Sequence, residues 1–365
     1  MKEKKKAETR HVGLDLGKRT YEMAIVGEDG KVIKSNGKTY VAARQSLYKK
    51  LRPNDKVALE AGNMAFIMAK EIEAAVGCKV YVLNPSNLAI IYASMKKTDK
   101  EDSLKLAHII EDFNEERLPV VPVPSDKEIR RRKILSSYQR AQQSRIRMIN
   151  QLHALFLSQG ITTKTRSDLA DPITRKEAIK ELTDIERKEA EYLLASLALC
   201  EKRIEELDKQ MKEEAAGDED IERLQSVPGV GPKTSFAFAA HVAAARFKNA
   251  SQVSNYIGLV PRVYISGDTV RYGRITKRGN GYLRALLVQS AWAMVRSKNG
   301  GKFKELFNYF TLEKSMSKKK AIVAVARRLA ELLYLIMRDE VRYVKMPFIR
   351  DEECSEKNTE LKKCA

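Results

Sequence analysis

The stretch His11-Val-Gly-Leu-Asp-Leu-Gly17 is an apolar, strand-like run interrupted by one acidic residue, Asp15. A second run of this kind, Lys56-Val-Ala-Leu-Glu-Ala61, carries Glu60. In a chain with 32% charged residues, a single acid is most simply a surface residue. A charge inside an apolar strand, however, normally needs a partner, because burying an unpaired carboxylate is costly. The two placements therefore favour a common site for Asp15 and Glu60.

Two further acids, Asp99 and Asp102, are three residues apart in Thr98-Asp-Lys-Glu-Asp-Ser-Leu104. Helical residues at positions i and i+3 share one face, so both side chains can point at the same spot. A cluster of carboxylates is repulsive unless a cation neutralises it, and Mg²⁺ prefers hard oxygen ligands. Four carboxylates from three elements are what a one- or two-metal phosphoryl-transfer site needs.

The elements around these acids predict an α/β domain over residues 1–125. Three strands in a meander are followed by alternating helices and strands, which is the order expected of an RNase H-like fold. The predicted strands are Val12–Leu16, Thr20–Gly27, Lys31–Tyr40, Val57–Ala61 and Lys79–Leu83, and the predicted helices are Ala42–Leu51, Ala65–Val76 and the one that carries Asp99 and Asp102. In such a fold the first strand supplies the first acid.

Composition indicates the class of partner. The 365 residues are enough for two or three domains, and 68 Lys and Arg against 48 Asp and Glu leave a net charge of +20. This excess points to a polyanion, most simply nucleic acid, although structural binders share it. The four cysteines form no zinc or disulfide pattern, and no signal core or membrane span is visible. We therefore expect a cytoplasmic, nucleoid-associated protein.

Residues 126–216 are predicted to form a long helical, coiled-coil linker after the proline-rich end of the first domain. Ile129–Phe156 and Lys176–Met211 have apolar residues at helical spacing and predict an antiparallel helix pair. A charged helix face is usually only solvated. The first helix, however, carries the positive excess, so we favour nucleic-acid binding by its basic cluster and dimer contacts along the pair. That cluster is Arg130, Arg131, Arg132 and Lys133.

Residues 217–345 are predicted to form a mostly helical C-terminal domain, followed by a polar, disordered tail over residues 346–365. Pro228-Gly-Val-Gly-Pro-Lys233 has the pattern of a helix-hairpin-helix, whose turn and following helix N-terminus can face a phosphate with Lys233 nearby. Such hairpins also serve protein contacts. After Arg284 the chain is predicted to be helical to about Arg342, with a break at residues 317–320.

A glycine-punctuated loop over residues 255–284 is basic and rich in tyrosine, which suits phosphate contact and base stacking. Its candidate nucleic-acid-binding residues are Arg271, Arg274, Lys277, Arg278 and Arg284. Ser266 precedes Gly267 within it, but a lone Ser-Gly pair is far more typical of a plain turn than of a functional serine.

These motifs together resemble the insertion sequence one-ten family of transposases. This family is related to the Piv invertase and is described as bridge-RNA-guided recombinases. Its members combine a RuvC-like DEDD domain with a separate C-terminal transposase domain. The resemblance covers about residues 10–340. It rests on Gly13-Leu-Asp15-Leu-Gly17, Leu59-Glu60-Ala61, Lys97-Thr-Asp99-Lys-Glu-Asp102, Pro228-Gly-Val-Gly231, Gly258-Leu-Val-Pro261, Ser266-Gly267, Lys277-Arg-Gly-Asn280 and Leu283-Arg284.

The resemblance implies a DNA recombinase with a composite site. Asp15, Glu60, Asp99 and Asp102 fall on the family's metal-binding acids, with Mg²⁺ or Mn²⁺ as cofactor, and Ser266 falls on the nucleophile that forms a covalent serine–DNA intermediate. Target and donor DNA, a structured noncoding guide RNA and a tetramer of two dimers are the implied partners. The serine assignment stays open, because Ser251, Ser254 and Ser290 lie in the same domain.

Two other functions remain as alternatives. A RuvC-like structure-selective endonuclease, such as a junction resolvase, would use the same acids with water and would need no serine. A non-catalytic nucleic-acid binder would explain the charge but not the four placed acids.

Overall fold

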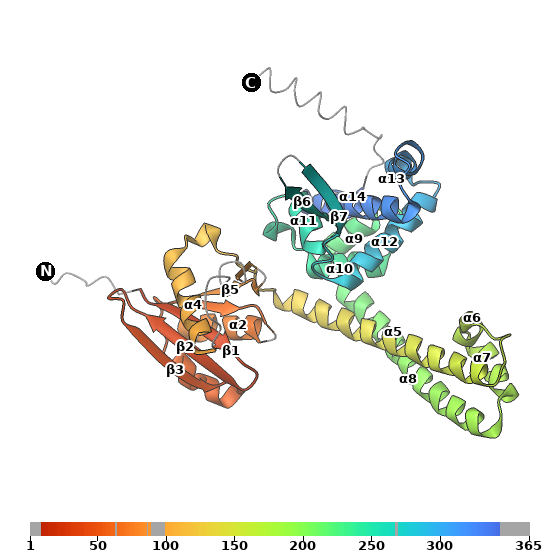
Figure 1. Ribbon diagram of the computed structural model, residues 1–365, viewed down its shortest axis with the longest axis horizontal. Coiled ribbons are helices and arrows are strands. Elements are labelled where there is room, and N and C mark those ends of the chain that lie inside the picture. Colours follow the sequence, from red (N-terminus) through yellow and green to blue (C-terminus); the bar gives the residue numbers. More distant parts are fainter. Residues whose placement is uncertain (1–8, 63, 86, 89–98, 267–268, 344–365) are drawn as a thin grey trace, which may run out of the picture. The chain divides into compact units, whose positions relative to one another are not determined.

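The computed structural model describes the chain except residues 1–8, 63, 86, 89–98, 267–268 and 344–365. The predicted tail over residues 346–365 lies outside the described residues. The chain divides into two compact units, Met1–Ser125 and Asp126–Ala365, which are taken separately (Figure 1). Within the described part, no helix combines the length and the apolar character needed to cross a bilayer.

The first unit contains a five-stranded sheet in the order β3-β2-β1-β4-β5. Strand β2 is antiparallel to both of its neighbours, whereas β1, β4 and β5 are mutually parallel. The strands are β1 (His11–Leu16), β2 (Thr20–Val26), β3 (Val32–Lys38), β4 (Lys56–Glu60) and β5 (Lys79–Leu83). The helices are α1 (Arg44–Tyr48), α2 (Ala65–Val76) and α4 (Asp99–Asp112), with short 3-10 turns at Val41–Ala43 and Glu115–Arg117. A meander followed by alternating strands and helices agrees with the predicted element order.

Alternation along the strands assigns each face of the sheet to its own helices. Val57 and Leu59 pack in one core with Ala65 and Met68 of α2, whereas Ala58 packs in another core with residues of α4. Successive strand residues point to opposite faces, so α2 and α4 cover opposite sides of the sheet.

The second unit begins with a pair of long helices, α5 (Asp126–Ser158) and α8 (Asp184–Ala215). The pair is antiparallel, because Arg131 near the start of α5 contacts Glu214 at the end of α8. The predicted start of the second helix at Lys176 is wrong. Asp171 caps a separate short helix by accepting a hydrogen bond from the Thr174 amide at 2.7 Å, and α8 begins only after the turn that follows. The connection contains α6 (Arg166–Ala170), α7 (Pro172–Ala178) and a 3-10 turn at Ile179–Glu181.

At the start of α5 and the end of α8, the helix pair shares a hydrophobic core with the helical body that follows it. Leu135 and Tyr138 of α5 and Leu207 and Met211 of α8 are buried in that core. The body comprises α9 (Glu219–Gln225), α10 (Pro232–His241), α11 (Ala250–Ile257), α12 (Gly281–Arg296), α13 (Gly301–Asn308), a π-helical turn (Tyr309–Glu313) and α14 (Lys318–Arg338), with a 3-10 turn at Ala244–Arg246. The far end of the pair packs in a core of its own, which includes Phe156, Leu169 and Leu193.

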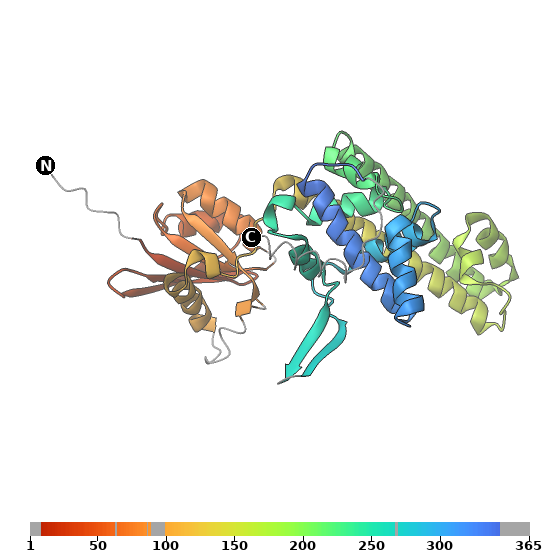
Figure 2. The ribbon, with the colours of Figure 1, turned by 90° about the horizontal axis from the view of Figure 1, so that it is seen from above.

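The basic stretch predicted to be a loop is a two-stranded antiparallel ribbon, β6 (Pro261–Ser266) and β7 (Thr269–Ile275). Figure 2 shows it extending away from the helices of its own unit. Alternating β-branched and aromatic residues, such as Val263 and Tyr264, favour strands over a loop.

Candidate active site and nucleic-acid interface

Asp15 and Glu60 lie side by side at the carboxyl end of two neighbouring parallel strands. Leu14 of β1 pairs with Leu59 of β4, so the next residue of each strand is one of the two acids. Neighbouring strands are about 4.8 Å apart, which brings the two backbones to that separation. Glu60 shares its face of the sheet with Ala58, the face that α4 covers.

Helix α4 crosses β1 at Gly13, two residues before Asp15 and therefore on the same face. A Cβ atom at Gly13 would lie 1.8 Å from the carbonyl oxygen of Ser103, so glycine is what allows this close approach. The approach brings Asp102, the residue before Ser103, to the face of the sheet that carries Asp15.

The direction of α4 brings its acidic start towards the acids of the sheet. Burial lowers the pKa of His11 at the beginning of β1, and the carboxylates of Glu111 and Asp112 partly oppose that shift. The last turn of α4 therefore lies near the beginning of β1, and its first turn lies towards the end of β1. The backbone of Asp99 is in that first turn, while its side chain lies outside the described part.

Asp102 has a cationic partner within its own helix. The Lys105 ammonium lies 3.1 Å from Oδ1 of Asp102, and the Lys105 side chain is only 9% exposed. Glu22 adds a carboxylate that the sequence analysis did not single out, since it pairs with Asp15 across β1 and β2. Directly opposed like charges are destabilising in a sheet, and a strand pairing prediction could have found this one.

The donor chemistry of these residues suits a divalent ion, because each offers hard carboxylate oxygens. Among the side chains that the structure describes, no three His, Cys, Asp or Glu residues converge closely enough to enclose a metal. The side chain of Asp99 lies outside that described part.

Ser266 is the last residue of β6 and is exposed, as are the residues that precede it on the ribbon from Arg262. Tyr264 pairs with Arg271, and Ser266 pairs with Thr269. Alternation puts these four residues on one face, and Val263, Ile265 and Tyr272 on the other. The ribbon thus has a polar face that contains the serine and an exposed apolar face.

The other candidate serines differ sharply in accessibility. Ser254 is fully buried and donates a hydrogen bond to Glu331 at 2.9 Å. Ser290 is buried against Thr234, with their hydroxyl oxygens 2.9 Å apart. Only Ser251, in the first turn of α11, is exposed as Ser266 is.

Several of the predicted nucleic-acid-binding residues face the protein interior. Arg131 is buried over the ring of Phe236 and pairs with Asp218. Burial would raise the pKa of Asp218, but hydrogen bonds from Lys127 and Arg131 lower it to about 2. These contacts join α5 to the helical body.

Arg132 and Arg284 are likewise bonded within the protein. Arg132 donates to the carbonyl of Ala240 at 2.8 Å, and Arg284 donates to three backbone carbonyls at the base of the ribbon. Burial lowers the pKa of the Arg284 guanidinium. The remaining members of the predicted set, other than Lys233, are exposed: Arg130, Lys133, Arg271, Arg274, Lys277 and Arg278.

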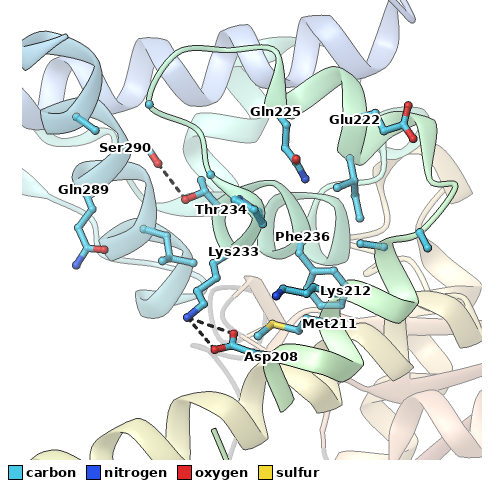
Figure 3. Close-up of a pocket in the computed structure, with 18 of the residues that line it drawn as sticks. Asp208, Met211, Lys212, Glu222, Gln225, Lys233, Thr234, Phe236, Gln289 and Ser290 are labelled. Carbon is cyan, nitrogen blue, oxygen red and sulfur yellow. Dashed lines mark hydrogen bonds and ion pairs between the residues drawn. The ribbon is translucent and has the colours of Figure 1, made fainter. Parts of the chain in front are cut away.

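Lys233 lies at one wall of a cavity of about 760 Å³ between α8, α9, α10 and α12 (Figure 3). Its ammonium pairs with Asp208 at 3.2 Å and lies 4.5 Å from the ring centre of Tyr138. Burial would lower the pKa of Lys233, but the hydrogen bonds to Tyr138 and Asp208 raise it. The side chains of Asp208 and Tyr138 thus hold the Lys233 ammonium at this wall of the cavity.

Comparison with known proteins finds two family models along the chain. A family model described as a DEDD transposase matches residues 12–159, which contain all four acids. A second model, described as the transposase IS116/IS110/IS902 family, matches residues 221–308, which contain the ribbon. The chain belongs to this transposase family. As a transposase it is an enzyme that acts on DNA, and its DEDD domain implies dependence on a divalent metal.

Curated relatives span most of the transposase. It is 28% identical over 301 residues to a probable family 20 transposase of Pseudomonas aeruginosa. The match covers 78% of this chain and 84% of the relative. It is 27% identical to the transposase for insertion sequence element IS1111A of Coxiella burnetii, covering 91% of this chain and 90% of the relative. The transposase for IS1328 of Yersinia enterocolitica is also 27% identical, covering 77% of this chain and 82% of the relative.

Proposed function

We propose that this transposase cuts and rejoins DNA through the hydroxyl of Ser266, acting with Asp15, Glu60, Asp99 and Asp102 as metal-binding acids on an RNase H-like domain. The observation that carries the proposal is the exposure of Ser266 on a basic ribbon, while Ser254 and Ser290 are buried. A nucleophile must reach the DNA backbone, and a buried serine cannot.

The covalent step balances without an external reagent. The Ser266 oxygen forms a bond to phosphorus and loses its proton, while a strand oxygen leaves and takes up a proton. Attack by another strand end on the serine–phosphate ester reverses the step. The phosphodiester energy is conserved in this ester, whereas attack by water would lose it.

The acids would hold Mg²⁺, or Mn²⁺ in its place, between the end of β1, the end of β4 and the start of α4. A bound divalent ion orients a phosphate and stabilises negative charge on its oxygens. The Lys105 ammonium, which lies 3.1 Å from Oδ1 of Asp102, adds positive charge beside the Asp102 carboxylate.

The ribbon would supply the nucleic-acid contacts around the serine. Arg271 shares the face of Ser266 and can donate to phosphate oxygens, and Tyr264 on that face can stack on a base. The +20 charge of the chain supports nucleic-acid binding, and a structured guide RNA beside DNA is what the family resemblance implies. The turn before Pro232, read as a helix-hairpin-helix, would add a backbone contact.

Denaturing gels with end-labelled donor DNA test the serine. Wild type should yield a covalent protein–DNA adduct that mass spectrometry maps to Ser266. Ser266→Ala should retain DNA and RNA binding but yield no adduct. Ser251→Ala is the matched control, since it removes the other exposed candidate serine and should retain the adduct. An adduct at another residue would contradict the proposal, and nicking by Ser266→Ala with water would favour a resolvase.

Variants of the acids test the metal site. Asp15→Asn, Glu60→Gln and Asp102→Asn should each abolish adduct formation and weaken Mn²⁺ binding measured by calorimetry, while nucleic-acid affinity is kept. The control is Glu116→Gln, an exposed acid of the same unit. Wild-type Mn²⁺ affinity and activity in any one of the three would remove that residue from the site.

A further inference from the structure

Among the described residues, those at the base of the ribbon are the ones that fix its direction relative to the helical body. From Arg262 to Ser266 every residue of β6 is exposed, so the strand packs little of its surface against the helical body. At the base, the Thr276 amide donates to the Val260 carbonyl at 2.8 Å, and the Lys277 amide donates to the Gly258 carbonyl at 3.2 Å. The direction of the ribbon is therefore set by the segments at residues 257–260 and 276–280.

Arg284 of α12 joins these two segments. Its Nη1 atom donates to the Ile257 carbonyl at 2.9 Å, and also to the carbonyls of Arg278 and Gly279. The Arg284 guanidinium thus bonds both the segment that precedes the ribbon and the segment that follows it. A bond of this kind from a charged donor is stronger than a neutral one.

Two glycines bring the same segments into direct backbone contact. A Cβ atom at Gly258 would lie 2.2 Å from the Arg278 carbonyl oxygen, and one at Gly279 would lie 2.1 Å from the Tyr256 carbonyl oxygen. Both glycines have positive φ angles, of 78° and 70°. The crossing is consequently too close for any other residue.

Asn280 fastens the end of the base to the helical body. Its side-chain oxygen caps α12 by accepting from the amides of Tyr282 and Leu283, at 2.9 and 3.2 Å. Its Nδ2 atom lies 2.8 Å from Nε2 of His241 on α10. An amide nitrogen can only donate, so the His241 ring accepts this bond.

We propose that Arg284 and Asn280 are positioning residues that fix the direction of the ribbon and thereby place the Ser266 hydroxyl for attack. The consequence for catalysis rests on the proposed role of Ser266. The role of Arg284 and Asn280 in fixing the direction of the ribbon does not. Neither side chain need contact DNA, because Arg284 is bonded within the protein and Asn280 bonds α10 and α12.

Ribbon motion can be measured directly in the full chain. A dye is attached at Thr269→Cys, the first residue of β7, after the native cysteines are replaced (Cys78→Ala, and Cys200, Cys354 and Cys364→Ser). Time-resolved anisotropy then separates ribbon motion from whole-protein tumbling. Arg284→Met should increase the amplitude of the fast decay at least about twofold, because the carbonyls lose their common donor. Arg284→Lys, which keeps a charged donor, should restore part of the order.

Matched variants separate positioning from general destabilisation. Arg271→Met removes an exposed arginine of the ribbon itself and should leave the fast decay unchanged. Asn280→Ser keeps an oxygen that can cap α12 but loses the bond to His241, so it should loosen the ribbon without loss of helix by circular dichroism. A rigid ribbon in Arg284→Met, with the fold intact, would overturn the proposal. An unchanged decay in Asn280→Ser would remove Asn280 from it.

The catalytic consequence has its own measurement. With DNA saturating, adduct yield should fall roughly tenfold or more in Arg284→Met, because small displacements of a nucleophile are costly, while DNA affinity changes less than about twofold. An unchanged adduct yield with a loosened ribbon would overturn the catalytic part. If wild type formed no adduct at Ser266, the proposed nucleophile would fail while the anisotropy result would still stand.

Discussion

Gly13 lies where helix α4 crosses strand β1, with Ser103 so close that even a methyl group has no room. Gly13→Ala should therefore destabilise the first unit by about 2 kcal/mol or more, since the helix must move to relieve the overlap. The same movement should weaken Mn²⁺ binding, because Asp102 precedes Ser103. Thermal unfolding and calorimetry measure the two effects.

The control for this substitution is Gly62→Ala in the same unit. A Cβ atom at Gly62 would meet only the Glu60 carbonyl oxygen, at 3.9 Å. Its melting temperature should stay close to that of wild type. Equal stability of the Gly13 and Gly62 variants would contradict the close packing of α4 on β1.

His241 gives the second unit a dependence on pH. Burial, with the nearby charge of Arg132, lowers its pKa to about 4, although Glu128 opposes the shift. The unfolded chain binds a proton near pH 6.5, the folded chain only near pH 4, so stability is full above pH 6.5 and falls as pH decreases between these values. The loss should reach about 3 kcal/mol at most.

Chemical denaturation at several pH values checks this expectation. His241→Gln keeps an oxygen that can accept from Asn280 but cannot titrate. The difference in unfolding free energy between wild type and this variant should therefore shrink or change sign towards pH 4. A difference that stays constant from pH 7 to pH 4 would contradict a buried, neutral histidine.

At the residue scale, the sequence predicted the elements that carry the acids better than it predicted the roles of the arginines. Asp15 and Glu60 interrupt apolar strands, and that interruption is visible without a structure. The sequence on either side of Arg131 and Arg284 does not distinguish these two residues from exposed arginines. Their inward contacts, to Asp218 and to three carbonyls, depend on residues distant in sequence or on backbone geometry.

At the element scale, α8 carries an exposed apolar stripe on a face that does not contact α5. Ile185, Tyr192 and Leu199 are spaced by seven residues and are 81%, 74% and 70% exposed. The residues of α8 that pack on the α5 side, such as Leu193 and Leu197, lie between them. A seven-residue apolar repeat is typical of a seam between helices, which supports the proposed dimer.

Charges in this stripe should therefore dissociate the proposed dimer. Tyr192→Glu with Leu199→Glu should shift the sedimentation profile from dimer to monomer, because two desolvated carboxylates in a helix seam are unfavourable. Ala198→Glu adds a charge at an exposed position of α8 outside the stripe and should leave the profile unchanged. A double variant that stays dimeric would place the contact elsewhere.

The ribbon shows where element prediction failed. Its glycines and arginines suggested a loop, but β6 and β7 are paired strands whose residues alternate between two faces. Apolar and polar residues do alternate along β6, but neither face of the hairpin is buried, and its glycines and arginines masked this alternation. The helix pair had apolar residues at helical spacing and was predicted, apart from the start of α8.

At the scale of the whole molecule, the net charge of +20 should make nucleic-acid binding strongly salt-dependent. The logarithm of affinity should fall steeply with the logarithm of salt concentration for a structured RNA and for donor DNA. Removing one phosphate contact lowers the slope on duplex DNA by about 0.9. Arg271→Met and Arg274→Met should each do so, whereas Arg284→Met should not.

Filter binding or anisotropy titrations at four or more salt concentrations measure these slopes. A flat slope for wild type would contradict an interface dominated by the phosphate backbone. A lower slope in Arg284→Met would show that this arginine contacts phosphate and is not confined to the ribbon base. The sequence could predict the sign and size of this charge, but not which cations the fold has already neutralised.

The solvent exposure of the ribbon also affects how the protein can evolve. Side chains such as Val263 and Tyr272 contribute little to the folded body, so their replacement costs little folding stability. Natural selection at these positions therefore depends almost entirely on the contacts that the ribbon makes, and hardly at all on folding stability. The ribbon surface can therefore vary in what it contacts, while Gly258, Gly279 and Arg284 at its base stay fixed.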